Sequence, residues 1–537
     1  MKNGYLNWEK LNNHYLYWLQ KNSIKKYLTN NHFFEGFSVW WINNLFRKDN
    51  IVDNKWYLDL KIILFDKKKI KFNFLIFLIY FNIKFILNLI IDLLFNIFIK
   101  IFVKKNKNVN KKNCFYSFSY NLISINNKLS VDRLYGKTPI SYKKKDNFYL
   151  IKVEKYRDFL INKNKYLKKF DNLNLDYCIL DHYISLFEII KIYTFSYKIF
   201  LNCVYKFYSK KFFFKINKKD CYNVLYPYFL NSFSVSTQRS LIFSKALNNF
   251  CKGNDKLNFF INYLEFNPGF VASNYFVRKS SPKIKVISLQ HAYASKNMLF
   301  YNNYSKDFTK LNKYEGKKYC PSPDYYFIFS QNLKNLLNNY YKKKVIFTGS
   351  LRTDLGNKIK KDKVFIGNKK KLNILIAPSI GDEYLISDYL KKIKNSYDYN
   401  FILSPHPTNY DTSLIKFKEL KETNFEFNSF RNISTQNLLI KSDLVICSLS
   451  SIAVDAKILS KDAIRLVSSN HPYYFEINEP IKVIKSYKSF STYLKNFKKE
   501  KDKTSRNKYI DFYYYKLDKK SYKRFWNNLK NIKNDYI

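Results

Sequence analysis

A histidine between two prolines is the first candidate for phosphate chemistry. The motif Ser404-Pro405-His406-Pro407 comes directly after the apolar run NFIL. At the end of a strand, the His406 imidazole could donate a hydrogen bond to a phosphate or to a leaving oxygen, while the prolines fix the loop and remove competing amide donors. The alternative is that His406 only caps its own loop.

The segment SLSSIAVDA, residues 448–456, is the second candidate for phosphate binding. It follows the strand-like run SDLVICS and has the pattern of a helix start. The hydroxyls of Ser450 and Ser451 would join backbone amides and the positive end of the helix dipole, a combination suited to a diphosphate. The alternative is N-capping by serine, but three serines within four residues exceed what a cap needs.

Three further polar residues follow apolar runs that look like strands. Glu265 follows LNFFINYL, and His291 stands in LQHA after IKVIS. A carboxylate and an imidazole at one edge of a sheet could act as a general base and its orienting partner. Arg352, in GSLRTD after KVIFT, could pair with a phosphate. Structural roles for all three stay open, including a domain-linking loop with a surface arginine.

These candidates share a position, because each follows a short β-branched or aromatic run. From residue 257 onward such runs alternate with helical patterns. The eight runs are LNFFINYLE, IKVISLQH, YYFIFS, KVIFTGS, LNILIAPS, NFILSPH, DLVICSLS and AIRLVSS. This alternation predicts parallel sheets with right-handed crossovers, in which ligands bind at the carboxyl ends of the strands. We therefore expect an α/β protein with two Rossmann-like domains. The first, acceptor-side domain covers 1–360, the second, nucleotide-sugar domain covers 361–497, and 498–537 returns to the first domain as a helix.

Residues 72–103 are the most apolar part of the chain. Their polar residues recur every four positions: Lys84, Asn88, Asp92, Asn96 and Lys100. On a helix this spacing makes one slowly winding polar stripe. The longest uncharged stretch, 72–83, is shorter than the roughly 18 residues that a membrane span requires. We expect an apolar helical insertion that lies on a membrane or on the protein, with a true span as the alternative, followed by a basic linker over 104–147.

The net charge of +54, from 95 Lys+Arg against 41 Asp+Glu, would suit nucleic acid or an anionic membrane. Lys, Asn, Ile, Tyr and Phe dominate the chain, however, and all have AT-rich codons. Basic and aromatic residues are also spread along the whole chain, whereas a nucleic-acid site predicts them on one surface. We therefore expect no nucleic-acid partner and leave attraction to anionic lipid or anionic substrates open.

Several common sites have no signal in this sequence. The seven cysteines are scattered without a CxxC or CxxH pair, and no P-loop, GxGxxG or HExxH is present. No metal, ATPase or dinucleotide site is therefore predicted. The first residues, MKNGYLNWEK, lack the apolar region of a secretory signal, so the cytoplasm is the expected location.

Taken in order, these segments resemble a known protein family. They are NYLEFNPGF, LQHAYASKNMLFYNNY, PSPDYYFIFS, FTGSLRTD, LSPHPTNYD and SDLVICSLSSIAVDA. Together they resemble the bacterial surface carbohydrate biosynthesis proteins linked to O-antigen and similar polysaccharide loci. The resemblance covers about residues 37 to 470 and is weakest over 72–147.

The resemblance implies a metal-independent glycosyltransferase of the GT-B type. Its partners would be a nucleotide-sugar donor, CMP- or CDP-linked, and a lipid-linked glycan acceptor. It would need no other cofactor and would lie in the cytoplasm, peripherally on the inner face of the plasma membrane. By analogy with the wider group of His-Pro transferases, His406, Ser450 and Ser451 would hold the nucleotide phosphates. Glu265 and His291 would face the acceptor.

Two positions depart from the pattern of that group. Ala292 stands where Gly, Ser or Thr follows the histidine, and Ser404 stands where a lysine precedes the His-Pro pair. A lost cation would weaken phosphate binding. A non-catalytic assembly protein of a polysaccharide complex is therefore the main alternative to an enzyme, and a nucleic-acid-binding protein is a less favoured third reading.

Overall fold

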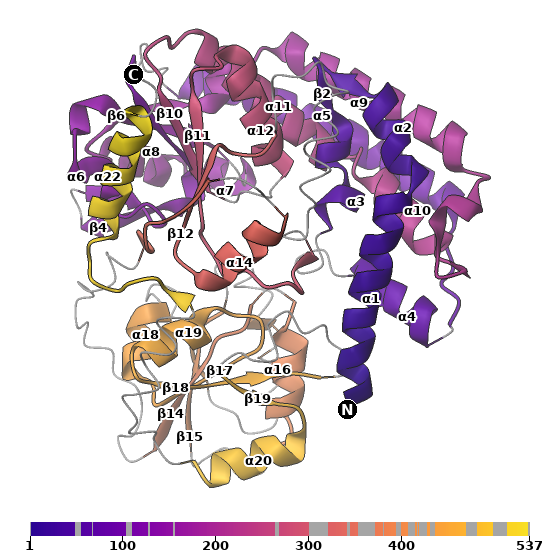
Figure 1. Cartoon of the computed structure of the whole chain (residues 1–537), viewed down its shortest axis with the longest axis vertical. Coiled ribbons are helices and arrows are strands. Elements are labelled where there is room, and N and C mark those ends of the chain that lie inside the picture. Colours follow the sequence, from indigo (N-terminus) through magenta and orange to yellow (C-terminus); the bar gives the residue numbers. More distant parts are fainter. Residues whose placement is uncertain are drawn as a thin grey trace.

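The computed structural model of the 537-residue chain contains two parallel α/β domains and a helical N-terminal arm (Figure 1). The expected fold class, an α/β protein with two Rossmann-like domains and an apolar helical insertion, is confirmed. The structure describes residues 2–48, 55–66, 68–103, 110–126, 129–153, 156–263, 268–299, 321–340, 344–352, 371–379, 381–393, 399–405, 414–415, 417, 427–429, 435–468, 481–497 and 513–534.

The first domain is built on a seven-stranded parallel sheet in the order β13-β12-β11-β10-β3-β6-β7. Its strands are β3 (Asn113–Phe118), β6 (Asn147–Lys152), β7 (Asp176–Ile179), β10 (Phe259–Tyr263), β11 (Lys285–Leu289), β12 (Tyr325–Ile328) and β13 (Lys344–Phe347). Within this sheet the first strand along the chain is β3, in the middle. The chain then adds β6 and β7 on one side of β3 and crosses to β10 on the other side. The point where the strand order reverses therefore lies between β3 and β10, and ligands bind at such points in open α/β sheets.

Helices cover both faces of this sheet. The Phe115 ring lies 6.0 Å from that of Phe525 on α22, between ring centroids. The next residue, Tyr116, points to the other face, 5.0 Å from Phe243 on α11. Because both faces are covered, β3, β6 and β10 are buried at every position, as the apolar strands of parallel sheets usually are.

The prediction of a basic linker over 104–147 is wrong for the described part of that segment. It contains the central strand β3 and the antiparallel pair β4 (Leu122–Asn126) and β5 (Leu129–Asp132). Asparagines made this segment look like a loop, but two of them satisfy each other. The side-chain amide of Asn113 donates to the side-chain carbonyl of Asn147 at 2.7 Å, and both residues are buried.

The second domain has a six-stranded parallel sheet in the order β16-β15-β14-β17-β18-β19. Its strands are β14 (Leu372–Ile376), β15 (Tyr399–Leu403), β16 (Phe427–Ser429), β17 (Leu444–Cys447), β18 (Asp462–Leu466) and β19 (Lys482–Ile484). Here the strand order reverses between β14 and β17. Each of the eight strand-like runs predicted from residue 257 onward is a strand in the two sheets, although β3, β6, β7, β16 and β19 were not predicted.

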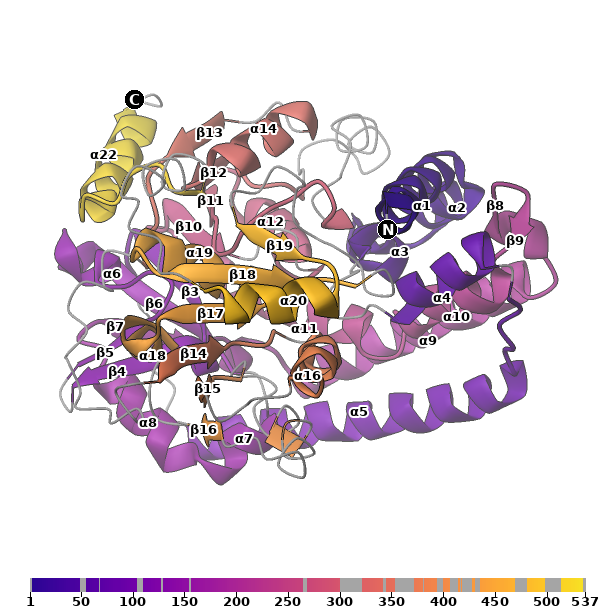
Figure 2. The ribbon, with the colours of Figure 1, turned by 90° about the horizontal axis from the view of Figure 1, so that it is seen from below.

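The helices frame the two sheets and build the arm (Figures 1 and 2). They are α1 (Lys2–Lys21), α2 (Ser23–Asn31), α3 (Asn44–Arg47), α4 (Lys55–Phe65), α5 (Phe74–Phe102), α6 (Thr138–Ser141), α7 (Tyr156–Ile161), α8 (Lys163–Asp171), α9 (Leu186–Phe207), α10 (Tyr222–Asn231), α11 (Ser236–Lys252), α12 (Pro268–Ser280), α14 (Gln331–Tyr340), α16 (Glu383–Leu390), α18 (Thr435–Lys441), α19 (Ile452–Ile458), α20 (Tyr487–Lys495) and α22 (Ser521–Asn534). The short strand pairs β1 (Phe33–Phe34) with β2 (Phe37–Ser38) and β8 (Lys215–Ile216) with β9 (Lys219–Asp220) belong to the arm.

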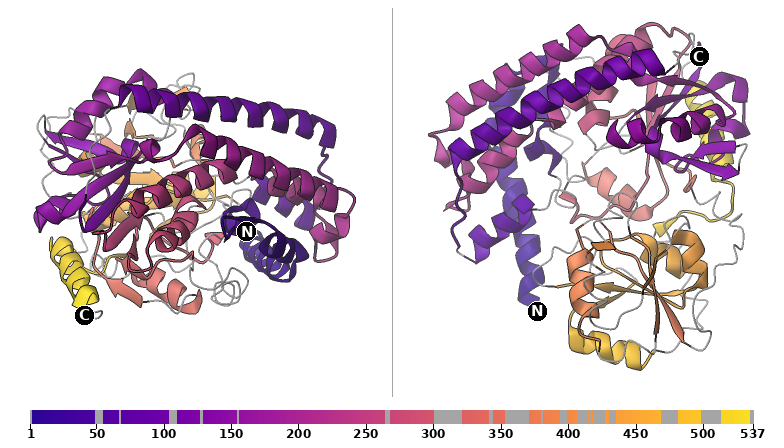
Figure 3. Two further views of the ribbon diagram at one scale, coloured as in Figure 1. Left: turned by 90° about the horizontal axis from the view of Figure 1, so that it is seen from above. Right: turned by 180° about the vertical axis from the view of Figure 1, so that it is seen from behind.

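Two long helices, α5 and α9, connect the arm to the first domain (Figure 3). The side chain of Asn73 caps α5 by accepting a hydrogen bond from the Ile76 amide at 3.1 Å. A reciprocal capping box between Ser185 and Glu188 starts α9. Phe81 of α5 stacks on Phe200 of α9 at 3.7 Å between ring centroids, so the two helices pack closely.

The C-terminal helix α22 packs on the first domain, where the sequence placed a returning helix. The Trp526 indole donates to the Thr138 carbonyl at 3.1 Å, and Phe525 lies against Phe327 of β12. Gly349 allows this close approach. A Cβ there would lie 2.6 Å from the Ser521 hydroxyl, and its φ of +84° favours glycine. The domain boundary predicted at residue 360 lies outside the described residues.

Candidate functional site

The loops after β14 and β17 form the candidate site of the second domain. Parallel strands bring their carboxyl ends to one edge of a sheet, and the strand order reverses between these two strands. A crevice for a ligand is expected there. The segment Ser448–Ser451 leads from β17 into α19, as the sequence predicted for a phosphate-binding loop.

Two buried charged residues hold this serine loop in place. The Arg465 guanidinium, fully buried on β18, donates to the backbone carbonyls of Ser448 and Ser450, each at 2.8 Å. On the other side, the Asp382 carboxylate accepts hydrogen bonds from the amides of Ser379 and Leu449, each at 2.7 Å. Asp382 thus joins the loop after β14 to the loop after β17.

Burial raises the pKa of the Asp382 carboxyl to about 7, while the two amide hydrogen bonds oppose that rise. Neither Asp382 nor Arg465 was predicted from the sequence. An available signal was the arginine in the otherwise apolar run AIRLV, since a charge inside a buried strand needs specific partners.

The two predicted serines have different local roles. The Ser450 hydroxyl accepts a hydrogen bond from the Ile452 amide at 3.4 Å, so it caps the start of α19. Ser451 occupies the N-cap position, but its side chain makes no capping hydrogen bond. Both residues are partly exposed. Ser451 therefore has a hydroxyl that could meet a ligand, while Ser450 is partly committed to the helix.

Arg352 lies where the two domains meet. Its guanidinium is 3.2 Å from the Asp455 carboxylate of α19. The same carboxylate accepts a hydrogen bond from the Tyr514 hydroxyl at 2.9 Å. Arg352, which was predicted to bind a phosphate, thus forms an ion pair between the two domains. The sequence had placed Arg352 and Asp455 in separate motifs and did not predict that they meet.

His291 and Arg352 line one small cavity of about 20 Å³, together with Tyr263 and the loop after β13. This volume holds about one water molecule. The preceding residue, Gln290, ties the ends of β11 and β12 together. Its side-chain carbonyl accepts from the amides of Phe329 and Ser330, at 2.9 and 3.1 Å. Gln290 is therefore a structural partner that orients the loop carrying His291.

Two of the predicted site residues, Glu265 and His406, lie outside the described residues. Their neighbours are described. Tyr263 ends β10, and the Ser404 hydroxyl at the end of β15 shares a hydrogen bond of 2.9 Å with Thr435. The roles of Glu265 and His406 stay predictions.

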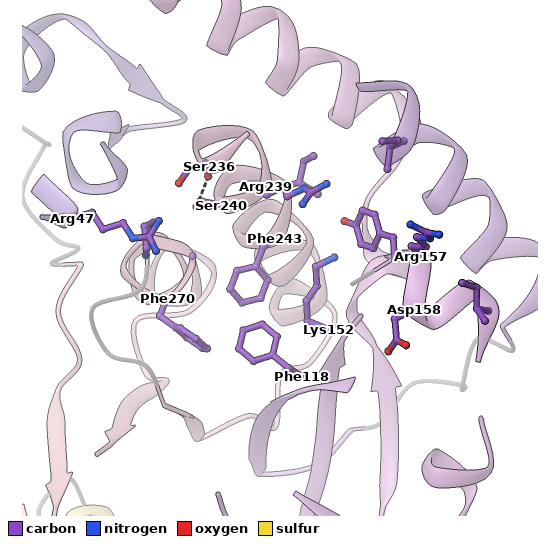
Figure 4. A pocket seen from close by; sticks show the side chains of 16 residues that line it. Arg47, Phe118, Lys152, Arg157, Asp158, Ser236, Arg239, Ser240, Phe243 and Phe270 are labelled. Atoms are coloured by element: carbon purple, nitrogen blue, oxygen red, sulfur yellow. Dashed lines mark hydrogen bonds between the residues drawn. The ribbon is translucent and has the colours of Figure 1, made fainter. Parts of the chain in front are cut away.

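A larger cavity, of about 860 Å³, lies at the carboxyl ends of β3 and β6 in the first domain. It was not predicted from the sequence. Four cationic side chains line this cavity, which is named the basic pocket after them (Figure 4): Arg47, Lys152, Arg157 and Arg239. Phe118, Phe243 and Phe270 form an apolar wall, and Asp158 is the one acidic residue among the described lining. These residues come from six helices and strands that are far apart in the sequence, which is why no local motif revealed them.

No family model and no curated protein matches this chain. Among solved structures, a putative UDP-N-acetylglucosamine 2-epimerase from Listeria monocytogenes is 11% identical, with a TM-score of 0.47, covering 80% of this chain and 98% of that chain. The UDP-GlcNAc 2-epimerase from Neisseria meningitidis bound to UDP-GlcNAc is 13% identical, with a TM-score of 0.42 and coverages of 78% and 100%. The calicheamicin glycosyltransferase CalG4 is 7% identical, with a TM-score of 0.43 and coverages of 79% and 98%. At these scores the similarities assign no activity to this chain.

Proposed function

We propose that this chain is a glycosyltransferase that moves a sugar from a nucleotide-activated donor to a growing surface polysaccharide. The observation that carries the proposal is the serine loop at the strand-order reversal of the second sheet. A buried arginine and a buried aspartate hold this loop from both sides. Such preorganisation suits a loop that must present its amides and the Ser451 hydroxyl to a phosphate.

In this proposal the donor nucleotide lies along the carboxyl edge of the second sheet. Ser451 and His406 donate hydrogen bonds to the diphosphate and stabilise it as it leaves, without a metal. His291, oriented through Gln290, lies on the first-domain side, where it takes the proton of the acceptor hydroxyl with help from Glu265. The cavity of about 20 Å³ beside His291 is far smaller than a nucleotide sugar. The donor therefore binds outside it, over the serine loop.

The acceptor is a lipid-linked glycan in this proposal, and the enzyme works on the cytoplasmic face of the plasma membrane. The basic pocket supports an anionic acceptor on the first domain, since it opens at the other strand-order reversal. A cytidine nucleotide is the expected donor, by the resemblance to His-Pro transferases.

Calorimetric titration of the purified chain with CMP, CDP, UDP, GDP and UDP-GlcNAc tests the donor site. We expect Ser451→Ala and His406→Ala each to weaken binding by about 10- to 150-fold, the value of a charge-assisted hydrogen bond. Their effects should be non-additive, because both side chains would address one diphosphate. Ser486→Ala is a matched control, since Ser486 caps α20 in the same domain by accepting from the Ser489 amide.

Equal binding by wild type and both variants would refute these donor residues, and so would a lack of binding by every nucleotide. Donor hydrolysis is measured in parallel. Nucleotide binding with no hydrolysis and no transfer would favour the non-catalytic assembly protein over the enzyme.

A further inference from the structure

The helix α5 lies on the outside of the protein (Figures 2 and 3). Thirteen large apolar side chains between Leu75 and Phe102 are exposed, and they define the outer face of α5. Two residues of the polar stripe, Asp92 and Asn96, face inward instead, whereas Lys100 at its end is exposed. The Tyr193 hydroxyl donates to the buried Asp92 carboxylate at 2.7 Å, and the buried Asn96 amide donates to the Asp181 carbonyl at 2.9 Å. An exposed apolar face of this length marks an interaction site.

Among the described residues, α5 is the one helix with the length and composition to cross a membrane. Its inward contacts run along the helix, however. Phe81 stacks on Phe200 at 3.7 Å between centroids, and fourteen positions later Phe95 stacks on Tyr156 at 3.8 Å. A helix tied to the protein body along one side leaves only its outer face for lipid. This geometry favours a helix that lies in the membrane plane.

Charge decides between a lipid surface and a second copy of the chain as the occupant of this face. The chain has a net charge of +54, so two copies repel each other, whereas an anionic bilayer attracts the protein. Lysines also lie next to the apolar face. The Lys163 ammonium lies over the Phe102 ring at 4.9 Å, and the Lys84 ammonium lies over the Tyr80 ring at 5.7 Å, with both rings exposed on that face. Aromatic and basic residues in this arrangement suit the lipid headgroup region.

The basic pocket adjoins this outer face. Ile91 belongs to the outer face of α5 and also lines the pocket. Ile161 of α7, which is exposed as well, lines the same pocket. A molecule anchored in the bilayer beside α5 can therefore reach the pocket without leaving the apolar surface.

The pocket is suited to phosphate groups. Arg239 is held 3.6 Å from Asp92, and Lys152 pairs with Asp181, so two of its four cations are positioned by acids behind the wall. The acidic residues in and behind the wall are Asp158, Asp92 and Asp181. Four cations against these three acids leave the pocket with a net positive charge. Two helices also begin at the pocket: Ser236 starts α11, and Pro268 starts α12. Their positive dipole ends add to the attraction for an anion.

We propose that the basic pocket binds the phosphate or diphosphate headgroup of a membrane lipid, while the outer face of α5 lies in the same membrane. The lipid tail stays in the bilayer beside Ile91 and Ile161, and the headgroup lies between the cations at the carboxyl ends of β3 and β6. This inference rests on the proposed function only in taking that lipid as the carrier of the acceptor glycan.

The test is flotation of the full chain with vesicles of three compositions. They contain phosphatidylcholine alone, phosphatidylcholine with phosphatidylglycerol, and the second mixture with part of its phosphatidylglycerol replaced by undecaprenyl diphosphate at equal charge. We expect no binding to the first, binding to the second, and tighter binding to the third. Inorganic pyrophosphate should compete for the extra binding alone, which separates a free phosphate ligand from a lipid headgroup.

Two sets of variants separate the face from the pocket. Leu94→Glu, on the outer face, should abolish binding to all vesicles but leave pyrophosphate binding in solution unchanged. Arg47→Gln with Arg157→Gln, on opposite sides of the pocket in Figure 4, should keep phosphatidylglycerol binding but lose the preference for undecaprenyl diphosphate by about 10- to 100-fold. Lys198→Gln is the matched control, because it removes a charge from exposed α9 outside the pocket and should keep that preference.

Undiminished preference for undecaprenyl diphosphate in the double variant would overturn the pocket assignment. Vesicle binding that survives Leu94→Glu, or a dimer in light scattering that this variant dissociates, would overturn the membrane assignment. Loss of pyrophosphate binding in Leu94→Glu would show misfolding, and Ile86→Glu on the same face then decides by the same criteria. Nucleotide titration does not depend on vesicle or pyrophosphate binding. Failure of the proposed donor site can therefore be told apart from failure of the lipid pocket.

Discussion

The guanidinium of Arg352, in the loop after β13, lies 3.2 Å from the carboxylate of Asp455 on α19. This ion pair joins residues 103 positions apart and connects the first domain to the helix that follows the serine loop. The Tyr514 hydroxyl holds the same carboxylate, and the Tyr514 ring stacks on Phe329 of the first domain at 5.3 Å between centroids. Any movement of the domains relative to each other must therefore act on the residue four positions beyond Ser451.

Breaking this pair should loosen the domain interface. Arg352→Ala leaves the largely buried Asp455 carboxylate with Tyr514 alone, and we expect a loss of about 1–2 kcal/mol in the free energy of unfolding, reduced from the value for a buried pair because Arg352 is partly exposed. Asp455→Asn should cost a similar amount, and the double variant little more than either. Denaturant unfolding measures all three. Lys296→Ala breaks an exposed pair with Glu9 and should change stability by less than about 0.5 kcal/mol. Fully additive effects would contradict the pairing.

Arg465 should act on nucleotide binding through the serine loop. Arg465→Met removes both hydrogen bonds to the loop carbonyls and should lower the free energy of unfolding by about 2–4 kcal/mol. Nucleotide affinity should fall by about tenfold or more as the loop loses its geometry. Arg465→Lys can keep one bond and should lie between.

A control with similar instability is needed for that result. Phe490 of α20 is fully buried and packs against the Tyr389 ring of α16. Phe490→Leu therefore makes a cavity in the core of the second domain at a position outside the serine loop. It should lose stability but keep nucleotide affinity, measured by titration below the unfolding temperature. Equal affinity losses in both variants would mean that Arg465 acts only through stability.

Asp382 should make stability fall as the pH rises toward neutrality. Burial raises its pKa to about 7, against roughly 3.9 in an unfolded chain. The folded state therefore holds this proton more tightly, so the contribution of Asp382 to stability is fully present below about pH 4 and is lost as the pH rises through 7. Unfolding of wild type and Asp382→Asn across this window should diverge, with the decline shallower in the variant.

Asp518→Asn provides the comparison for that experiment. Hydrogen bonds from Arg524 lower the pKa of Asp518 to about 2, so its stabilising effect is lost only as the pH falls below the unfolded value. Its profile should run parallel to that of wild type above about pH 5. Parallel profiles for Asp382→Asn would show that its carboxyl does not titrate differently in the two states.

The inner and outer faces of α5 should respond differently to truncation. Phe81→Ala removes a fully buried ring from its stack on Phe200, and we expect a loss of about 3–5 kcal/mol in the free energy of unfolding. Leu75→Ala truncates a side chain that is 67% exposed and should cost less than about 0.5 kcal/mol. Vesicle binding should weaken for Leu75→Ala even so. Equal stability losses would place Leu75 against the protein.

The sequence alone determined the local structure of much of this chain. Short β-branched and aromatic runs, most of them ending in Ser, His, Pro or Gly, correctly predicted eight of the nine strands from β10 to β18, all but β16, because strand formation depends on nearby residues and turns. The four-residue spacing from Lys84 to Lys100 likewise predicted a helix with one polar stripe. Where polarity misled, as at Asn113, the missing fact was the partner Asn147 in the neighbouring strand.

Only the tertiary structure decided which side of each element faces what. The stripe of α5 could have faced water, but Tyr193 and Asp181 form hydrogen bonds with its residues Asp92 and Asn96 inside the protein, and the apolar side faces outward. The pairs Arg352–Asp455 and Arg465–Ser448 and the basic pocket join segments from separate elements. Periodicity records the spacing of side chains along one element, whereas the contacts between distant elements arise when the sheets and helices pack, and no local pattern encodes them.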